Sequence, residues 1–284
     1  MSERKASATA FGTLYMRAIH RLLDAPPLIF DDSVSLMLLG EATANEIKKN
    51  HKNHRTLEAR ALRTNIVLRS RFAEDRLAEA VERGVTQYII LGAGFDTFAF
   101  RQPSWAGKLK IFEVDQPATQ AQKRSWLKDA GIIQPANLFF AGIDFERESL
   151  RDGLIRQGVS FEEPSFFSWL GVTVYLQKEA IDAVFRTISG FTEGSEIVFT
   201  FFPPPHSLPE KEKKLFSSLS RIVERSGEPF VSYFTNAEIE KKLKDFGFRS
   251  VDFLSVEEAE KRYFSNRPKD LFISKRSTIA YASL

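Results

Sequence analysis

Two glycines and two acids have the types and the spacing of a nucleoside-binding site. Gly92 and Gly94 follow the apolar run 88–91, and Glu113 and Asp115 end the next apolar run, 21 positions after Gly94 in the case of Asp115. A glycine turn after a strand lets a ligand lie against backbone N–H groups at the N-terminus of the following helix. An acid at the end of the second strand, about 20 residues further on, can accept hydrogen bonds from both hydroxyls of a ribose. The pattern therefore predicts a site for a nucleoside.

The residues around this turn separate the possible cofactors. A dinucleotide site needs a third glycine for close packing of the helix and for the pyrophosphate, but Thr97 stands at that position. Asp96 adds a carboxylate that would repel a pyrophosphate, whereas S-adenosyl-L-methionine carries a sulfonium, an ammonium and no phosphate. We therefore expect S-adenosyl-L-methionine as the cofactor. Two alternatives stay open from these residues alone: an NAD-dependent oxidoreductase, and a buried strand, turn and helix that binds nothing.

The composition excludes several kinds of site and partner. The 284 residues include no cysteine, which rules out disulfides, thiolate nucleophiles and cysteine-bound metals and suits a reducing cytoplasm. No spacing typical of metal ligands occurs, so we expect no metal. The net charge is only +3, and basic residues alternate with acids as in 210–214, so we expect no nucleic-acid partner. No apolar run approaches the roughly 18 residues of a membrane span, and we expect a cytoplasmic protein.

Apolar runs alternate with helical patterns through the middle of the chain. Strands are expected at 87–91, 109–114, 138–145, 165–170 and 196–202, and helices at 6–23, 33–39, 56–83, 117–130 and 177–190, with another that starts near residue 95. This order predicts an α/β fold with a doubly wound, mostly parallel, Rossmann-like sheet behind N-terminal helices. Ligands of such sheets bind beyond the carboxyl ends of the strands. Asp96, Asp115 and Asp144 all fall at those ends.

The pattern changes after residue 202. Three prolines at 203–205 give a stiff exit, and an amphipathic helix follows at 208–225. We expect this helix and the nearby aromatic residues to form an apolar lid over the strand ends, although core packing of an ordinary helix would give the same stripe. A helix at 236–246, a strand at 251–254 and an edge strand at 278–282 are expected to follow.

We expect one domain over residues 1–284. Its parts are an N-terminal helical region (1–83), a cofactor-binding core (84–202), a lid and substrate region (203–246) and C-terminal strands (247–284).

Several segments together resemble the leucine carboxyl methyltransferase superfamily. The segments that carry the resemblance are 26–32, 38–40, 69–72, 91–97, 113–117 and 169–176. They are most similar to the bacterial branch of S-adenosyl-L-methionine-dependent methyltransferases. The resemblance implies the class I methyltransferase fold over about residues 10 to 280.

The resemblance also implies roles for individual residues. Arg69 matches an arginine that pairs with the methionine carboxylate of the cofactor, a natural role for a planar bidentate donor. Gly92 and Gly94 match the turn beneath the methionine. Asp115 matches the acid that binds the ribose, and Glu113 either helps or orients the loop.

The resemblance also implies an adenine site, and this chain departs from the superfamily at one position. Asp144 and Phe145 match the pair at the adenine, with the carboxylate on the exocyclic amine and the apolar neighbour against the ring. Leu170, however, stands where many members of the superfamily have a glutamate. A contact near the methionine or the acceptor is therefore missing or is supplied by another residue.

Methyl transfer from a sulfonium chiefly requires that the acceptor be aligned with the methyl group. A carboxylate acceptor is already ionised at pH 7, whereas a hydroxyl acceptor gains from a general base. Among the four histidines only His206 is placed to reach the pocket, and Tyr175 could line the acceptor site; no catalytic residue is assigned. The sequence thus predicts an O-methyltransferase acting on a small carboxylate or hydroxyl acceptor, and Leu170 leaves open a cofactor-binding protein without turnover.

Overall fold

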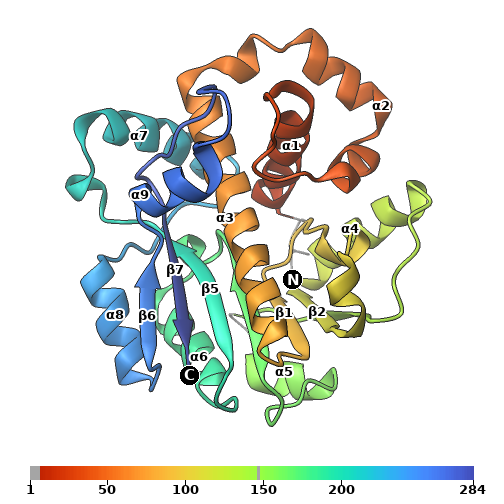
Figure 1. The fold of residues 1–284 in the computed structure, drawn as a ribbon, viewed down its shortest axis with the longest axis vertical. Helices are drawn as coiled ribbons and strands as arrows, with labels where there is room; N and C mark the ends of the chain where they lie inside the picture. Colours follow the sequence, from red (N-terminus) through yellow and green to blue (C-terminus); the bar gives the residue numbers. More distant parts are fainter. Residues whose placement is uncertain (1–6, 146–147) are drawn as a thin grey trace.

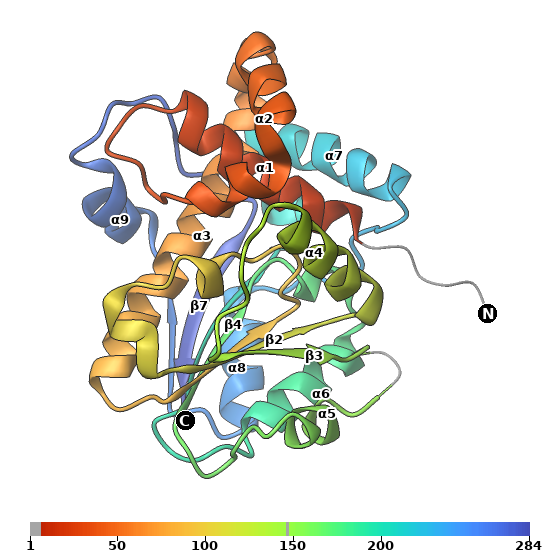
Figure 2. The same cartoon turned by 90° about the vertical axis from the view of Figure 1, so that its right-hand side faces the viewer.

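A seven-stranded mixed sheet lies between two layers of helices in the computed structural model, which describes residues 7–145 and 148–284 (Figures 1 and 2). The strands are β1 (Gln87–Leu91), β2 (Lys110–Asp115), β3 (Leu138–Gly142), β4 (Ser165–Trp169), β5 (Glu196–Phe201), β6 (Ser250–Phe253) and β7 (Thr278–Ser283). The helices are α1 (Ala8–Leu23), α2 (Ser33–Lys49), α3 (Leu57–Glu82), α4 (Pro117–Asp129), α5 (Leu150–Arg156), α6 (Lys178–Ile188), α7 (Glu210–Arg225), α8 (Asn236–Asp245) and α9 (Val256–Ala259).

The strand order is β3-β2-β1-β4-β5-β7-β6. The chain starts in the middle at β1, moves outward through β2 to β3, and then crosses back to continue from β4 on the other side of β1. The first five strands are parallel, and β7 is antiparallel to both β5 and β6. The expected doubly wound, mostly parallel sheet is confirmed. Its crossover point, where ligands bind in such sheets, lies at the carboxyl ends of β1 and β4.

Each face of the sheet has its own hydrophobic core. On one face α5, α6 and α8 pack through residues such as Leu154, Phe185 and Leu243. On the other face the long helix α3 packs through Val67, Phe72 and Leu77. Every residue of β1 and β5 is buried, as expected for strands that are covered on both faces. This rigid sheet holds the strand ends in place.

The N-terminal helices lie over one end of the sheet. Figure 2 shows α1, α2 and α7 together above the strands, while α5, α6 and α8 lie below. Leu14 of α1 and Leu38 of α2 share a small core with Phe95 and Leu127. Helices α1 and α7, which are far apart in the sequence, thus cover the same end of the sheet.

The helix expected to begin near residue 95 is absent, and that prediction is wrong. Short 3-10 turns at Phe98–Phe100 and Ser104–Lys108 connect β1 to β2 instead. The Asp96 side chain accepts the Phe98 N–H at 2.8 Å, which closes a local turn, and Pro103 interrupts the short connection. The glycine turn is therefore not followed by a helix N-terminus.

One smaller expectation also needs correction. The strand at 278–283 is not at an edge, because it pairs with β5 on one side and with β6 on the other. The expected end of the second helix at residue 39 is confirmed, because Gly40 has the non-helical angles φ +76° and ψ 166°. The rest of α2, up to Lys49, is a second helical segment that continues after this kink.

No helix within residues 7–145 and 148–284 is long and apolar enough to cross a membrane.

Candidate functional site

A cavity of about 410 Å³ lies where the parallel strands end. Its floor is formed by residues that follow β1, β2, β3 and β4. All six residues expected to bind the cofactor line it: Arg69, Gly92, Gly94, Asp115, Asp144 and Phe145. The structure thus brings together side chains that are up to 76 positions apart in the sequence (from residue 69 to residue 145).

The glycine turn allows close approach of other parts of the chain. Gly92 has φ +65° and Gly94 has φ +51°, which side chains disfavour. A Cβ on Gly92 would overlap Val172, and a Cβ on Gly94 would lie 2.9 Å from the Cβ of Ala10 in α1. Glycine is therefore required here both by the backbone and by the neighbours that close around it.

Asp115 is fixed by the backbone. Its Oδ2 accepts the Gly94 N–H at 2.5 Å, and its Oδ1 accepts the Gln116 N–H at 2.6 Å. Burial raises the pKa of the carboxyl, against the opposing effect of these two hydrogen bonds. Each oxygen keeps a second lone pair, so the carboxylate is held in one orientation and can still accept further hydrogen bonds.

Arg69 brings an uncompensated positive charge to the cavity. Burial lowers the pKa of its guanidinium to about 10, and no carboxylate in the described ranges 7–145 and 148–284 forms an ion pair with it. The guanidinium lies against Gly171, whose φ is +75°; a Cβ there would be 2.7 Å from Nη2 and 2.8 Å from Cζ of Arg69. A buried cation without a counter-charge is costly, so this arrangement suits a negatively charged ligand.

Glu113 does not reach the cavity. It is fully buried and forms an ion pair with Lys123 of α4. Burial raises the pKa of Glu113 to about 7, although the charge of Lys123 opposes the shift. Of the two roles considered for this acid, direct help at the ribose is therefore excluded by its position.

The two residues expected at the adenine, Asp144 and Phe145, line the cavity beyond β3. Phe145 is partly buried and packs against the core of the α5 and α6 face, and Asp144 donates its backbone N–H to Glu148 at 3.4 Å. Leu170 lines the opposite wall beyond β4 and packs against the α3 core. At that wall the chain therefore offers an apolar surface.

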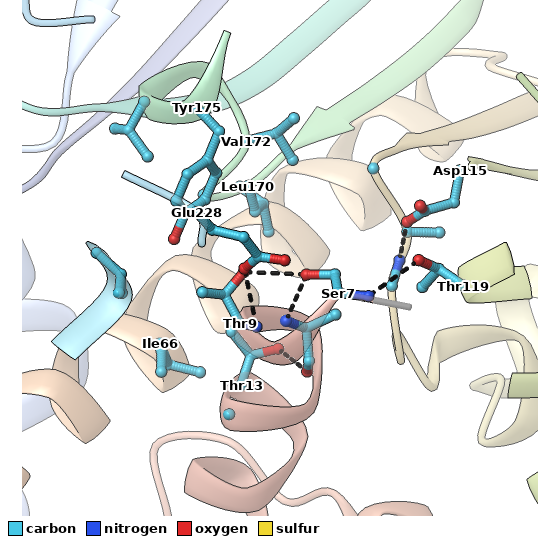
Figure 3. Close-up of a pocket in the computed structure, with 18 of the residues that line it drawn as sticks. Ser7, Thr9, Thr13, Ile66, Asp115, Thr119, Leu170, Val172, Tyr175 and Glu228 are labelled. Carbon is cyan, nitrogen blue, oxygen red and sulfur yellow. Dashed lines mark hydrogen bonds between the residues drawn. The ribbon is translucent and has the colours of Figure 1, made fainter. Parts of the chain in front are cut away.

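The roof of the cavity was missed from the sequence. Six residues at the start of α1 line it together with Glu228, in the loop after α7 (Figure 3): Ser7, Ala8, Thr9, Ala10, Gly12 and Thr13. Ser7 donates its N–H to Thr119 Oγ1 at 3.3 Å, and Thr9 donates its N–H to Glu228 Oε2 at 3.1 Å. No periodicity or motif marks these positions, because their partners lie 112 and 219 residues away.

Arg17, also missed, ties α1 to the glycine turn. It is 4% exposed, donates a short hydrogen bond to the Phe95 carbonyl, and lies 3.1 Å from Asp32 Oδ2 and 3.9 Å from Asp96 Oδ2. Its helical spacing with Leu14 would have placed it on an inner face. Asp96 therefore shares the positive charge of Arg17 with Asp32.

Tyr175 lines the cavity and His206 does not. Burial raises the pKa of the Tyr175 hydroxyl to about 12, despite hydrogen bonding with Thr9 and the nearby charge of Arg69, so the phenol is protonated at neutral pH. His206 is exposed on the 3-10 turn after β5, and the expectation that it could reach the pocket is wrong. No histidine lines the cavity within the part of the chain that the structure describes.

The same described residues contain no group of three or more His, Cys, Asp or Glu side chains that could hold a metal ion.

Comparisons with known proteins agree with this geometry. The family model for leucine carboxyl methyltransferase matches residues 10–189. The "Putative S-adenosyl-L-methionine-dependent methyltransferase YktD" of Bacillus subtilis is 32% identical over 302 aligned positions, which cover 99% of this chain and 98% of the relative.

Solved structures show the same fold at low identity. A "putative methyltransferase" from Thermobifida fusca superposes with a TM-score of 0.56 at 17% identity, covering 94% of this chain and 93% of the other. A DUF574 family protein from Streptomyces avermitilis also gives 0.56, at 13% identity, over 94% and 96% of the two chains.

Proposed function

Since the chain belongs to the leucine carboxyl methyltransferase family and is an S-adenosyl-L-methionine-dependent methyltransferase, we propose that it methylates a carboxylate oxygen of a small acceptor with an apolar body. The observation that carries the proposal is a cavity that joins an unpaired cation and a ribose-type acid to an apolar wall, with no histidine among the described residues that line it. The NAD-dependent alternative is not supported by the family match.

S-adenosyl-L-methionine, when bound, supplies a methyl group activated by a sulfonium. In our proposal Arg69 holds the methionine carboxylate and Asp115 accepts the ribose hydroxyls, as its fixed orientation allows. Gly92 and Gly94 let the backbone lie close to the ligand. Asp144 and Phe145 hold the adenine beyond β3.

The acceptor is proposed to bind at the side of the cavity below α7. Apolar side chains gather there from the segments that follow β4 and β5, from α7 and from the loop after α7: Val172, Val174, Phe202, Leu219, Ile222, Val223 and Phe230. Phe202 and Phe216 pack edge to face, which ties α7 to the end of β5. We propose that α7 acts as a lid whose apolar face excludes water from the reacting groups.

The chemistry of the wall favours a carboxylate over a hydroxyl acceptor. A hydroxyl group must lose its proton during transfer, and a base for this step contributes typically about 10²–10⁴-fold. Tyr175 is protonated at neutral pH and cannot accept that proton. A carboxylate acceptor is already ionised and needs only to be aligned with the methyl group.

Radiolabelled methyl transfer tests the proposal. The purified protein is incubated with methyl-labelled cofactor and matched pairs of acceptors, each pair sharing one apolar body with either a carboxylate or a hydroxyl. Peptides and RNA serve as comparison acceptors. We expect labelling of the carboxylates, and the Tyr175→Phe variant should keep this activity because the phenol does not act as a base. Preferential labelling of hydroxyls, peptides or RNA would contradict the proposal.

A further inference from the structure

We propose that Glu228 binds the α-ammonium group of the cofactor's methionine part, opposite Arg69 at its carboxylate. The inference rests on the orientation proposed above, in which the amino-acid end of the cofactor lies beside Arg69. It assigns a binding role to a residue outside the strand ends, in the loop after α7.

Glu228 has an acceptor oxygen to spare inside the cavity. The side chain is half-buried and points toward the start of α1 (Figure 3). Its Oε2 accepts the Thr9 N–H at 3.1 Å. Its Oε1 has no hydrogen bond or ion pair with any residue in the described ranges 7–145 and 148–284. A carboxylate can accept about four hydrogen bonds, so an ammonium can be added without displacing Thr9.

The other acids of the cavity are placed for different roles. Asp96 accepts the Phe98 N–H and faces Arg17, and both oxygens of Asp115 accept backbone N–H groups. Asp144 follows β3, which is separated from β4 by β2 and β1. Arg69 lies against Gly171, directly beyond β4. The methionine end of the ligand therefore lies on the side of the cavity away from Asp144.

Arg69 and Glu228 act on the same small region. Both charges influence the hydroxyl of Tyr175, whose pKa is raised chiefly by burial, lowered by Arg69 and raised by Glu228. An α-amino acid is a zwitterion, with opposite charges on groups attached to one carbon. A cation and an anion that line one cavity and both act on one hydroxyl complement that charge pair. Leu170 contributes no charge at this wall, so the carboxylate that pairs with the ammonium group must come from another residue.

Binding measurements on three ligands test the assignment without any acceptor. They are S-adenosylhomocysteine, decarboxylated S-adenosylmethionine, which keeps the ammonium, and methylthioadenosine, which lacks both charged groups. Glu228→Gln keeps an oxygen for Thr9 but removes the charge. It should weaken the first two ligands by about tenfold or more and leave the third unchanged. Arg69→Gln should weaken only S-adenosylhomocysteine.

Glu224→Gln is the matched control, because Glu224 is exposed on α7 and does not line the cavity. It should bind all three ligands like the wild type. Equal weakening of methylthioadenosine by Glu228→Gln would show a distorted pocket and overturn the proposal. Unchanged binding of S-adenosylhomocysteine and decarboxylated S-adenosylmethionine by Glu228→Gln would also overturn it. Failure of the carboxylate-acceptor proposal leaves these binding results unaffected.

Discussion

Asp115→Asn should weaken both the cofactor and the fold, because both carboxylate oxygens already have backbone partners. An amide has one oxygen and one NH₂ group. Either Gly94 or Gln116 must then direct its N–H at another donor. Leaving one buried N–H without an acceptor costs about 1–3 kcal/mol of unfolding free energy. For a chain of this size that corresponds to a loss of roughly 2–4 °C in melting temperature per kcal/mol.

The loss of affinity has a separate cause. A hydrogen bond to a charged acceptor contributes about 1.5–3 kcal/mol. Loss of one ribose contact therefore lowers the affinity for S-adenosylhomocysteine by roughly tenfold to a hundredfold. Titration calorimetry measures the affinity, and thermal unfolding without ligand measures the stability. Asp129→Asn is the control, because Asp129 is exposed at the far end of α4.

An Asp115→Asn protein that is destabilised but binds with the wild-type dissociation constant would refute the ribose assignment. Asp115 would then serve only to hold the glycine turn. Wild-type stability combined with lost affinity would instead refute the account of its backbone hydrogen bonds.

Gly171→Ala should weaken S-adenosylhomocysteine by at least about tenfold, because the new Cβ displaces the Arg69 guanidinium. Gly158→Ala is the control, because Gly158 has a similar positive φ of +81° with open space around it. Calorimetry should show that this variant loses about 1–2 kcal/mol of unfolding free energy through backbone strain but binds the ligand like the wild type. Equal binding by both variants would contradict the steric account. The native Glu113 carboxyl, with its pKa of about 7 against 4.5 ordinarily, holds a proton that the unfolded chain has lost between these pH values. Its contribution to stability is therefore present below about pH 4.5 and is lost as the pH rises through about 7, so urea unfolding should show the wild type losing stability relative to Glu113→Gln over that range; parallel pH profiles would contradict the shift.

The sheet and the floor of the site were predictable because their signals are local. Apolar β-branched runs mark β1 and β5, and Gly94 and Asp115 lie at the ends of neighbouring parallel strands. The apolar stripe of α7 likewise predicted a helix, and one end of it does line the cavity. These features depend on residues whose partners are fixed by strand order.

The roof could not be predicted, because it depends on pairing between distant segments. Thr9 and Glu228 are 219 residues apart, and neither belongs to a recognisable pattern. The helix predicted after β1 was wrong for another reason. The usual order of strand, turn and helix was given more weight than the local turn signals of Asp96 and Pro103. The position of β7 inside the sheet follows from two antiparallel pairings that its own sequence does not reveal.

The place of β7 determines when the sheet can be completed during synthesis on the ribosome. The five parallel strands need no residue beyond Phe201 to pair with one another. β6 is made earlier than β7 but touches the sheet only through it. Until residues 278–283 have been made, the outer edge of β5 therefore has open hydrogen-bonding groups, and β6 has no neighbour. An open edge of a buried strand invites pairing with other chains, so the nascent protein is most vulnerable to aggregation in the interval between β5 and β7.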